Sequence, residues 1–191
     1  MANSSTLVPA ARKSRQLTQA QLAGRARLDQ PTVSRVERGR DVAFQAVDRL
    51  LGATGYRLYS APTRRDDAAT VAGEIRTYLE RGDSDRALRA LIQLDDNLVS
   101  ERGLVRGVLG LAEPEPTRHP VWDAVIAAVV ARRLREEGLP TPDWVDAPSR
   151  HLDRPQQLRV DVADPVPPAS EVPQEFAERG VLMWRDTFAS V

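Results

Sequence analysis

The sequence LTQAQLAGRARLDQPTVSRVERG, residues 17–39, predicts two short helices joined by a tight turn. Thr18 is a suitable N-cap for the first helix, and Gln21, three residues later, completes a capping box. Asp29 is a suitable N-cap for the second helix. Pro31 then falls in the first turn of that helix, where its missing N–H costs little. The two start signals therefore predict a helix, a turn and a second helix within 23 residues.

The residues of this stretch separate into an apolar and a polar side. Gly39 ends the second helix, because glycine adopts the left-handed conformation without strain. The apolar side consists of Leu22, Ala23, Ala26, Leu28, Val33 and Val36. The outward-facing residues are Gln30, Pro31, Ser34, Arg35 and Arg38. A short helix, a turn and a second helix with a polar outer face suit the major groove of DNA.

This stretch resembles the helix-turn-helix of the Xre family, the domain type of small phage repressors and many antitoxins. The matching residues are Leu17-Thr18-Gln19, Leu22-Ala23 and the run from Thr32 to Gly39. The resemblance extends to about Tyr59. Two positions depart from the family, which often has glycine where this chain has Gln16 and Arg27. A positive φ at either residue would cost about 1 kcal/mol.

The resemblance implies roles for individual residues. Gln30 and Arg35 match the positions whose side chains reach base edges, where glutamine pairs with adenine and arginine with guanine. Gln19, in the first turn of its helix, matches a phosphate-contacting glutamine. The resemblance further implies that Arg12 and Glu37 form an ion pair inside the domain. We favour this structural role over direct DNA contact by the two residues. The neighbouring residues expected at bases or phosphates are Pro31, Thr32, Ser34, Arg38 and Arg40.

Further elements are expected around the helix-turn-helix. Residues 8–15 predict a first helix, and a helix with the apolar residues Phe44, Val47, Leu50 and Leu51 follows the loop 40–43. The sequence GYRLYS, residues 55–60, alternates in the manner of a short strand. A lone strand leaves its backbone groups unpaired, so we expect it to pair with a second copy through Tyr56 and Leu58. The alternative is a loop or helix extension that packs locally.

The net charge of zero hides an uneven distribution. Residues 1–65 contain 12 Lys or Arg and 4 Asp or Glu, whereas residues 66–191 contain 15 basic and 23 acidic residues. A basic first part suits a polyanion. The acidic remainder argues against DNA wrapping around the whole molecule.

Several classes of chemistry lack the residues they need. The chain has no cysteine, and His119 and His151 have no partner at metal-ligand spacing, so we expect no metal and no cofactor. No phosphate-binding glycine motif is present, and no serine can be placed beside a base, so we do not expect an enzyme. Because no signal peptide or membrane span is recognisable, we expect a cytoplasmic, nucleoid-associated protein.

The second part of the chain predicts further helices and then a proline-rich tail. We expect a DNA-binding domain at residues 1–60, a linker at 61–66, a helical domain at 67–138 and a tail at 139–191. The fold class is therefore mainly all-α, with the short dimerising strand and an extended tail. The large apolar residues of the tail, which we expect to contact a partner, include Trp144, Phe176, Trp184 and Phe188.

These features favour a sequence-specific DNA-binding regulator that binds a palindromic operator as a homodimer. The carboxyl half resembles that of some actinobacterial Xre-type regulators. This resemblance implies an antitoxin that autorepresses its operon and neutralises a nearby-encoded toxin, commonly of the nucleotidyltransferase type. Two alternatives stay open: a one-component repressor whose helical domain binds a small ligand, and an interaction module that does not bind DNA.

Overall fold

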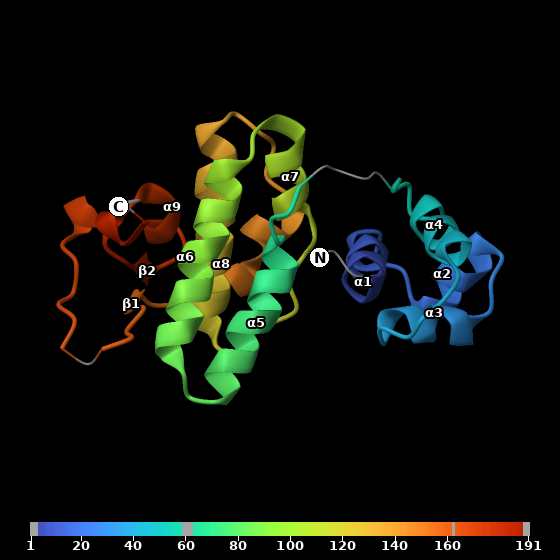
Figure 1. Cartoon of the computed structure of the whole chain (residues 1–191), viewed down its shortest axis with the longest axis horizontal. Helices are drawn as coiled ribbons and strands as arrows, with labels where there is room; N and C mark the ends of the chain where they lie inside the picture. The colour runs from blue at the N-terminus through green and yellow to red at the C-terminus, as the bar shows by residue number, and fades with distance from the viewer. Residues whose placement is uncertain (1–3, 59–62, 162, 189–191) are drawn as a thin grey trace. The chain divides into compact units, whose positions relative to one another are not determined.

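The computed structural model describes residues 4–58, 63–161 and 163–188, and the chain divides into two compact units (Figure 1). Unit 1 is Met1–Arg64 and unit 2 is Arg65–Val191. The described part is mainly helical, which confirms the predicted mainly all-α class. None of its helices is long and apolar enough to cross a membrane.

The described residues of unit 1 form four helices around a small core (Figure 1). They are α1 (Ser4–Ser14), α2 (Gln19–Ala26), α3 (Gln30–Glu37) and α4 (Phe44–Gly52). Helix α1 begins earlier than the expected residue 8. The buried core residues are Val8, Ala11, Leu22, Ala23, Ala26, Val33, Val36, Val47, Leu50 and Leu51. Phe44, expected on the apolar side, is instead 71% exposed, because it occupies the first position of α4.

The predicted helix starts of unit 1 are confirmed. The Thr18 hydroxyl accepts a hydrogen bond from the backbone N–H of Gln21 (3.2 Å), whose side chain accepts one from the Thr18 N–H (2.8 Å). Asp29 accepts from the backbone N–H of Thr32 (3.0 Å). Gln16 and Arg27 have φ angles of 54° and 53°, so both non-glycine residues adopt the left-handed conformation.

Unit 2 is built around one central helix. Its first elements are α5 (Ala68–Glu80), α6 (Ser84–Ser100), α7 (Gly103–Leu111) and α8 (Pro120–Glu136). Helix α8 contacts α5, α6 and α7 as well as the tail, and its residues 122–131 are all buried. A buried ion pair joins α6 to α8: Arg133 Nε and Nη2 donate to the two carboxylate oxygens of Asp95, each at 2.6 Å.

The proline-rich tail folds onto the helices of unit 2. Its described residues form four 3-10 helices, η1 (Asp143–Asp146), η2 (Pro148–Arg150), η3 (Ala169–Glu171) and η4 (Arg185–Phe188), and one short α-helix, α9 (Gln174–Ala177). Two strands, β1 (Gln156–Gln157) and β2 (Val181–Leu182), pair in parallel with Gln156 opposite Val181. The sequence did not predict this pairing, because the two strands are short and far apart in the chain.

Apolar residues and arginines hold the tail in place. Trp144, Phe176 and Phe188 belong to the core of unit 2, with the Phe176 and Phe188 ring centroids 5.6 Å apart. Arg179 is 1% exposed and donates to the Val145 carbonyl (3.1 Å) and to Asp146 (2.6 Å). The tail is therefore part of the core of unit 2 and not an extended arm.

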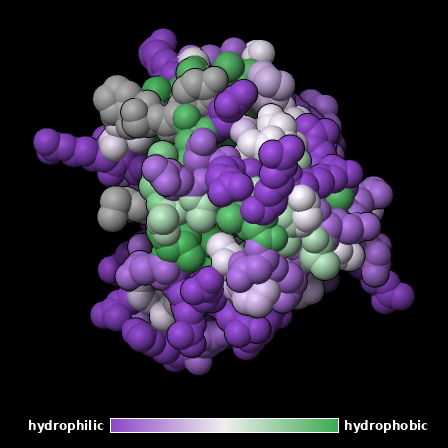
Figure 2. Space-filling view, turned by 90° about the vertical axis from the view of Figure 1, so that its right-hand side faces the viewer, coloured by the Kyte–Doolittle hydropathy of each residue, from purple (hydrophilic) through white to green (hydrophobic). Residues whose placement is uncertain are grey.

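Hydrophilic residues make up most of the surface that Figure 2 shows, and apolar residues form smaller areas among them. Exposed large apolar residues are few in the described chain. They are Phe44, Val99, Leu104, Val108, Leu111 and Val166.

Candidate nucleic-acid interface

The proposed recognition helix is α3, and its first turn is held by a hydrogen-bonded group. Asp29 caps the helix through the Thr32 N–H, and Arg35 Nη2 donates to the Thr32 hydroxyl (2.8 Å). Hydrogen bonds from the side chain and the backbone of Thr32 lower the pKa of Asp29, and the positive charge of Arg35 adds to the effect. Thr32 thus links the cap of α3 to the arginine one turn later.

A second hydrogen-bonded chain crosses from α3 to α1. Gln30 Nε2 donates to Gln19 Oε1 (2.8 Å), and Gln19 Nε2 donates to Glu37 Oε2 (2.8 Å). Glu37 in turn accepts from Arg12 Nε (2.6 Å) and Nη2 (3.1 Å), which is the ion pair that the resemblance implied. Arg12 also donates to the Leu17 carbonyl (2.8 Å). This series of hydrogen bonds fixes the N-termini of α2 and α3 relative to each other.

The expected DNA-contacting residues differ in their exposure. Gln19 and Thr32 are half-buried. The exposed ones are Gln30, Pro31, Arg35, Arg38 and Arg40. Ser34 is an exception: it is 9% exposed, so it does not face outward as expected. A serine side chain is too short to reach past its neighbours from this buried position, and we remove Ser34 from the candidate contacts.

Unit 1 has other exposed cations that were not singled out from the sequence. Arg25 and Arg27 are exposed at the end of α2, and Arg49 is exposed on α4, where its Nη2 donates to the Arg27 carbonyl (3.3 Å). Local pattern gave no signal for them, because an arginine on a solvated helix face is common whatever the function. Arg15 differs, because it donates to the Thr54 carbonyl (2.9 Å) and so serves within the unit.

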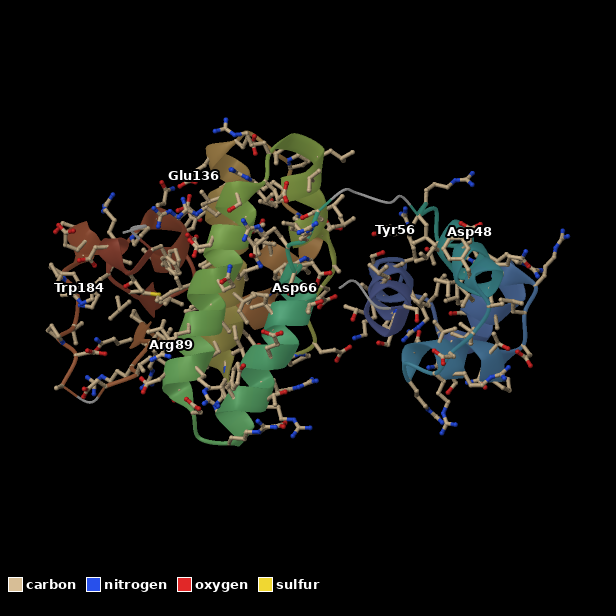
Figure 3. All side chains as sticks on the ribbon, viewed as in Figure 1. Asp48, Tyr56, Asp66, Arg89, Glu136 and Trp184 are labelled. Atoms are coloured by element: carbon tan, nitrogen blue, oxygen red, sulfur yellow. The ribbon has the colours of Figure 1, made fainter. Side chains whose placement is uncertain are left out.

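The expected dimer residues lie against unit 1 itself. Tyr56 and Leu58 are half-buried and pack against the core of the unit, and the Tyr56 hydroxyl lies 3.2 Å from that of Ser14 (Figure 3). Residues 55–58 form no strand, and the remaining Tyr59 and Ser60 lie outside the described residues. The described part of GYRLYS therefore adopts the alternative arrangement, a locally packed loop. The reason is that the aromatic ring and the leucine find apolar surface within the same unit.

Three of the four expected partner-binding residues are also buried. Trp144 and Phe188 are each 6% exposed, and Phe176 is fully buried, so their role as surface anchors is wrong for this structure. The physical reason is that the helices of unit 2 offer the apolar surface these side chains need. Only Trp184 stays half-exposed, in the C-terminal segment (Figure 3), where its Nε1 donates to the Pro165 carbonyl (3.1 Å).

Within the described residues, no group of three or more His, Asp or Glu side chains has an arrangement that could hold a metal ion.

Comparison with known proteins matches the first part of the chain. Residues 8–58 match the family described as a helix-turn-helix domain. No curated protein and no solved structure matches the chain. The match and the exposed polar face of α3 together define a helix-turn-helix domain at residues 8–58, a domain type that supports DNA binding.

Proposed function

We propose that the chain is a sequence-specific regulator of the Xre type that binds a palindromic operator as a homodimer. The observation that carries the proposal is the pair of hydrogen-bonded groups on α3. One group fixes Gln30 against Gln19, and the other fixes Arg35 against Thr32. Side chains held in one orientation lose little conformational freedom on binding, which favours recognition of particular bases.

The two fixed side chains have complementary chemistry. An exposed glutamine can form two hydrogen bonds with adenine, and an exposed arginine can form two with guanine. Gln19 lies in the first turn of α2, where backbone N–H groups favour a phosphate oxygen. Arg38 and Arg40 follow at the end of α3 and are expected to contact phosphates.

Arg35→Ala tests this assignment. We expect it to cost about 1–3 kcal/mol of binding to the preferred site and to reduce non-specific binding much less. Arg40→Ala is the matched comparison, because loss of a phosphate contact weakens binding to all sequences alike. The measurement is a titration of labelled DNA carrying the chain's own promoter and of an unrelated duplex. Equal losses on both duplexes for Arg35→Ala would identify Arg35 as a phosphate contact.

We also propose that unit 2 binds a protein toxin of the nucleotidyltransferase type encoded nearby, so that the chain is an antitoxin that autorepresses its operon. Residues 66–191 carry eight more acidic than basic residues, which suits a basic partner that handles nucleotides. Trp184, half-exposed on this acidic unit, is the aromatic residue best placed to contact the partner. Co-purification with the neighbouring gene product, and rescue of its toxicity, would support this role. The antitoxin role would be contradicted if the chain neither bound a neighbouring gene product nor protected cells against one.

One pocket favours a different role for unit 2, that of a ligand-binding repressor. The pocket has a volume of about 160 Å³ and is lined by residues of α6 and the tail, including Leu88, Leu158, Met183 and Trp184. Its volume is below the usual range for drug-sized ligands, so only a small metabolite would fit. A rise in the melting temperature with such a metabolite would favour this role. If the chain fails to bind its own promoter at all, an interaction module is the better description.

A further inference from the structure

Helix α7 exposes an apolar face that nothing in the described part of unit 2 covers. Leu104, Val108 and Leu111 are 81%, 38% and 48% exposed, and they lie on one side of the helix at spacings of three and four residues. Val99, at the end of α6, is another exposed apolar residue nearby in sequence. Because water-exposed apolar residues are usually scattered singly, a stripe of this kind marks a contact surface.

The opposite face of α7 explains why the helix does not turn this stripe inward. Leu109 and Gly110 are buried, and a Cβ atom at Gly110 would lie 2.8 Å from a Val130 methyl carbon. Trp144 Nε1 donates to the Gly110 carbonyl (3.1 Å), and Arg106 donates to the Arg133 carbonyl (3.2 Å). The inner face is therefore fixed by close packing and hydrogen bonds, and the stripe must point outward.

Gly107 has no role in the packing of its own unit. It is half-buried, and a Cβ atom there would meet no heavy atom within 4 Å. Glycine inside a helix is less favourable than alanine. A glycine that packing within its own unit does not require is explained if the backbone of another chain approaches its side of the helix closely.

We infer that this face of α7, defined by Leu104, Gly107, Val108 and Leu111, is the surface through which two copies of the chain associate. The spacing is self-complementary. In an antiparallel helix pair with its two-fold axis at the level of Gly107 and Val108, Leu104 lies against Leu111 of the second copy. Gly107 then lies opposite Val108 of the second copy, and its missing side chain leaves room for the valine, so the two backbones can approach closely.

The absence of charged side chains on the stripe separates a second copy from two other occupants, a nucleic acid and a basic partner. Each unit 2 is acidic, so two copies repel each other except where their contact surface is uncharged. The exposed stripe of α7 contains no charged side chain, because Arg106 is buried and pairs with Glu137 (3.1 Å). A nucleic acid would need cations on this face, and a basic partner would be drawn to the carboxylates elsewhere.

The size of the stripe predicts a weak dimer. One pair of nine-residue helices buries less than the roughly 1,200 Å² of total surface that a stable interface needs. Association would therefore be completed on DNA, where two half-sites bring two copies together. The inference deepens the proposed function, since a palindromic operator requires a two-fold symmetric protein.

Analytical ultracentrifugation of the full chain without DNA tests the inference. We expect a monomer–dimer equilibrium that shifts with protein concentration. Leu104→Glu and Leu111→Lys should each abolish the dimer. The double variant Leu104→Glu/Leu111→Lys should restore it, because the new side chains meet with opposite charge across the pair. Val166→Glu changes another exposed apolar residue, 53% exposed, and should leave the dimer unchanged.

Gly107→Ala adds a variant that separates folding from association. Alanine should raise the melting temperature of the dilute monomer, because it has the higher helix propensity and enough space. The same change should weaken the dimer by separating the backbones. Circular dichroism of every variant checks that the exposed substitutions leave the fold intact.

A wild-type chain that stays monomeric at the highest concentration would overturn the inference, as would a dimer that survives Leu104→Glu. Failure of the double variant to restore the dimer would also overturn it. If Leu104→Glu instead abolished only the capture of the neighbouring gene product, a partner protein would be the occupant and the inference wrong. Because sedimentation needs no DNA, a dimer that binds no operator would contradict the proposed function alone.

Discussion

At the scale of single residues, two positions of unit 1 keep side chains where glycine would be relaxed. Gln16 and Arg27 have positive φ angles, and Arg27 is the C-cap of α2, with its N–H donating to the Ala23 and Gly24 carbonyls. The left-handed conformation costs an L-residue roughly 1–2 kcal/mol. The turn between α2 and α3 therefore forms although the left-handed conformation of Arg27 destabilises it.

Arg27→Gly should raise the free energy of unfolding of unit 1 by about 0.5–1 kcal/mol, allowing for the greater freedom of glycine in the unfolded chain. Arg27→Ala is the control, because it removes the same side chain but keeps the strain. Hydrogen exchange of the amides in α2 and α3 measures the difference. Equal protection in the two variants would mean that the strain at Arg27 is negligible.

Thr32 is the residue that we expect to orient Arg35 for base recognition. Thr32→Val keeps the shape but removes the hydroxyl that accepts from Arg35, so it should cost about 0.5–1.5 kcal/mol of specific binding. The preference at the base read by Arg35 should weaken most. Selection of binding sites from random duplexes, with Thr32→Ser as the conservative control, measures this preference. If Thr32→Val keeps the wild-type preference, Thr32 does not position Arg35.

At the scale of elements, the tail stabilises unit 2 because its large side chains complete the core. Phe176, on α9 of the tail, is fully buried next to Phe188, and the Val145 carbonyl accepts a hydrogen bond from Arg179. Removal of residues 139–191 would expose this core surface. If the truncated chain no longer binds a partner, the loss could therefore result from unfolding of unit 2 as well as from removal of a binding surface.

Phe176→Ala should lower the free energy of unfolding of unit 2 by about 3–5 kcal/mol, the usual cost of a large cavity in a core. Trp184→Ala should cost less, because Trp184 is half-exposed. All three tryptophans lie beyond residue 66, so their fluorescence during urea unfolding reports on unit 2. A cost for Phe176→Ala no larger than that for Trp184→Ala would place Phe176 outside the core.

At the scale of the whole molecule, the two units carry opposite charge and are expected to respond differently to solution conditions. In unit 2, Arg135 Nη1 donates to Glu178 (2.9 Å), which joins α8 to the segment after α9. This hydrogen bond lowers the pKa of Glu178 below its usual value of 4.5. The pair thus couples the tail to the central helix through a group that titrates in acid.

The free energy of unfolding of unit 2 should fall as the pH drops below about 4.5. A carboxyl whose pKa is lower in the folded state than in the unfolded state stabilises the fold at any pH above its unfolded pKa, and this contribution is lost when the folded carboxyl is protonated. Thermal melts followed by tryptophan fluorescence between about pH 6 and pH 3 measure this change. Glu178→Gln should flatten part of the dependence. An unchanged profile in that variant would show that other carboxylates, such as Glu136, account for it.

The sequence by itself determined the helices of unit 1 and their caps. Thr18 and Asp29 bond to backbone groups only three residues away, so these start signals depend on nothing distant. The further helices expected between residues 67 and 138 form as α5, α6, α7 and α8 for a similar reason. Apolar spacing along one helix is a local property of the chain.

Only the tertiary structure decided where the tail, Tyr56 and Ser34 lie. The pairing of Gln156 with Val181 joins residues 25 positions apart, and neither strand has enough residues to show a pattern. The sequence around an aromatic residue in a proline-rich segment is the same whether its side chain contacts a partner or packs into the core of its own unit. Burial depends on which surfaces are within reach after folding, and that information lies in long-range packing and not in local sequence.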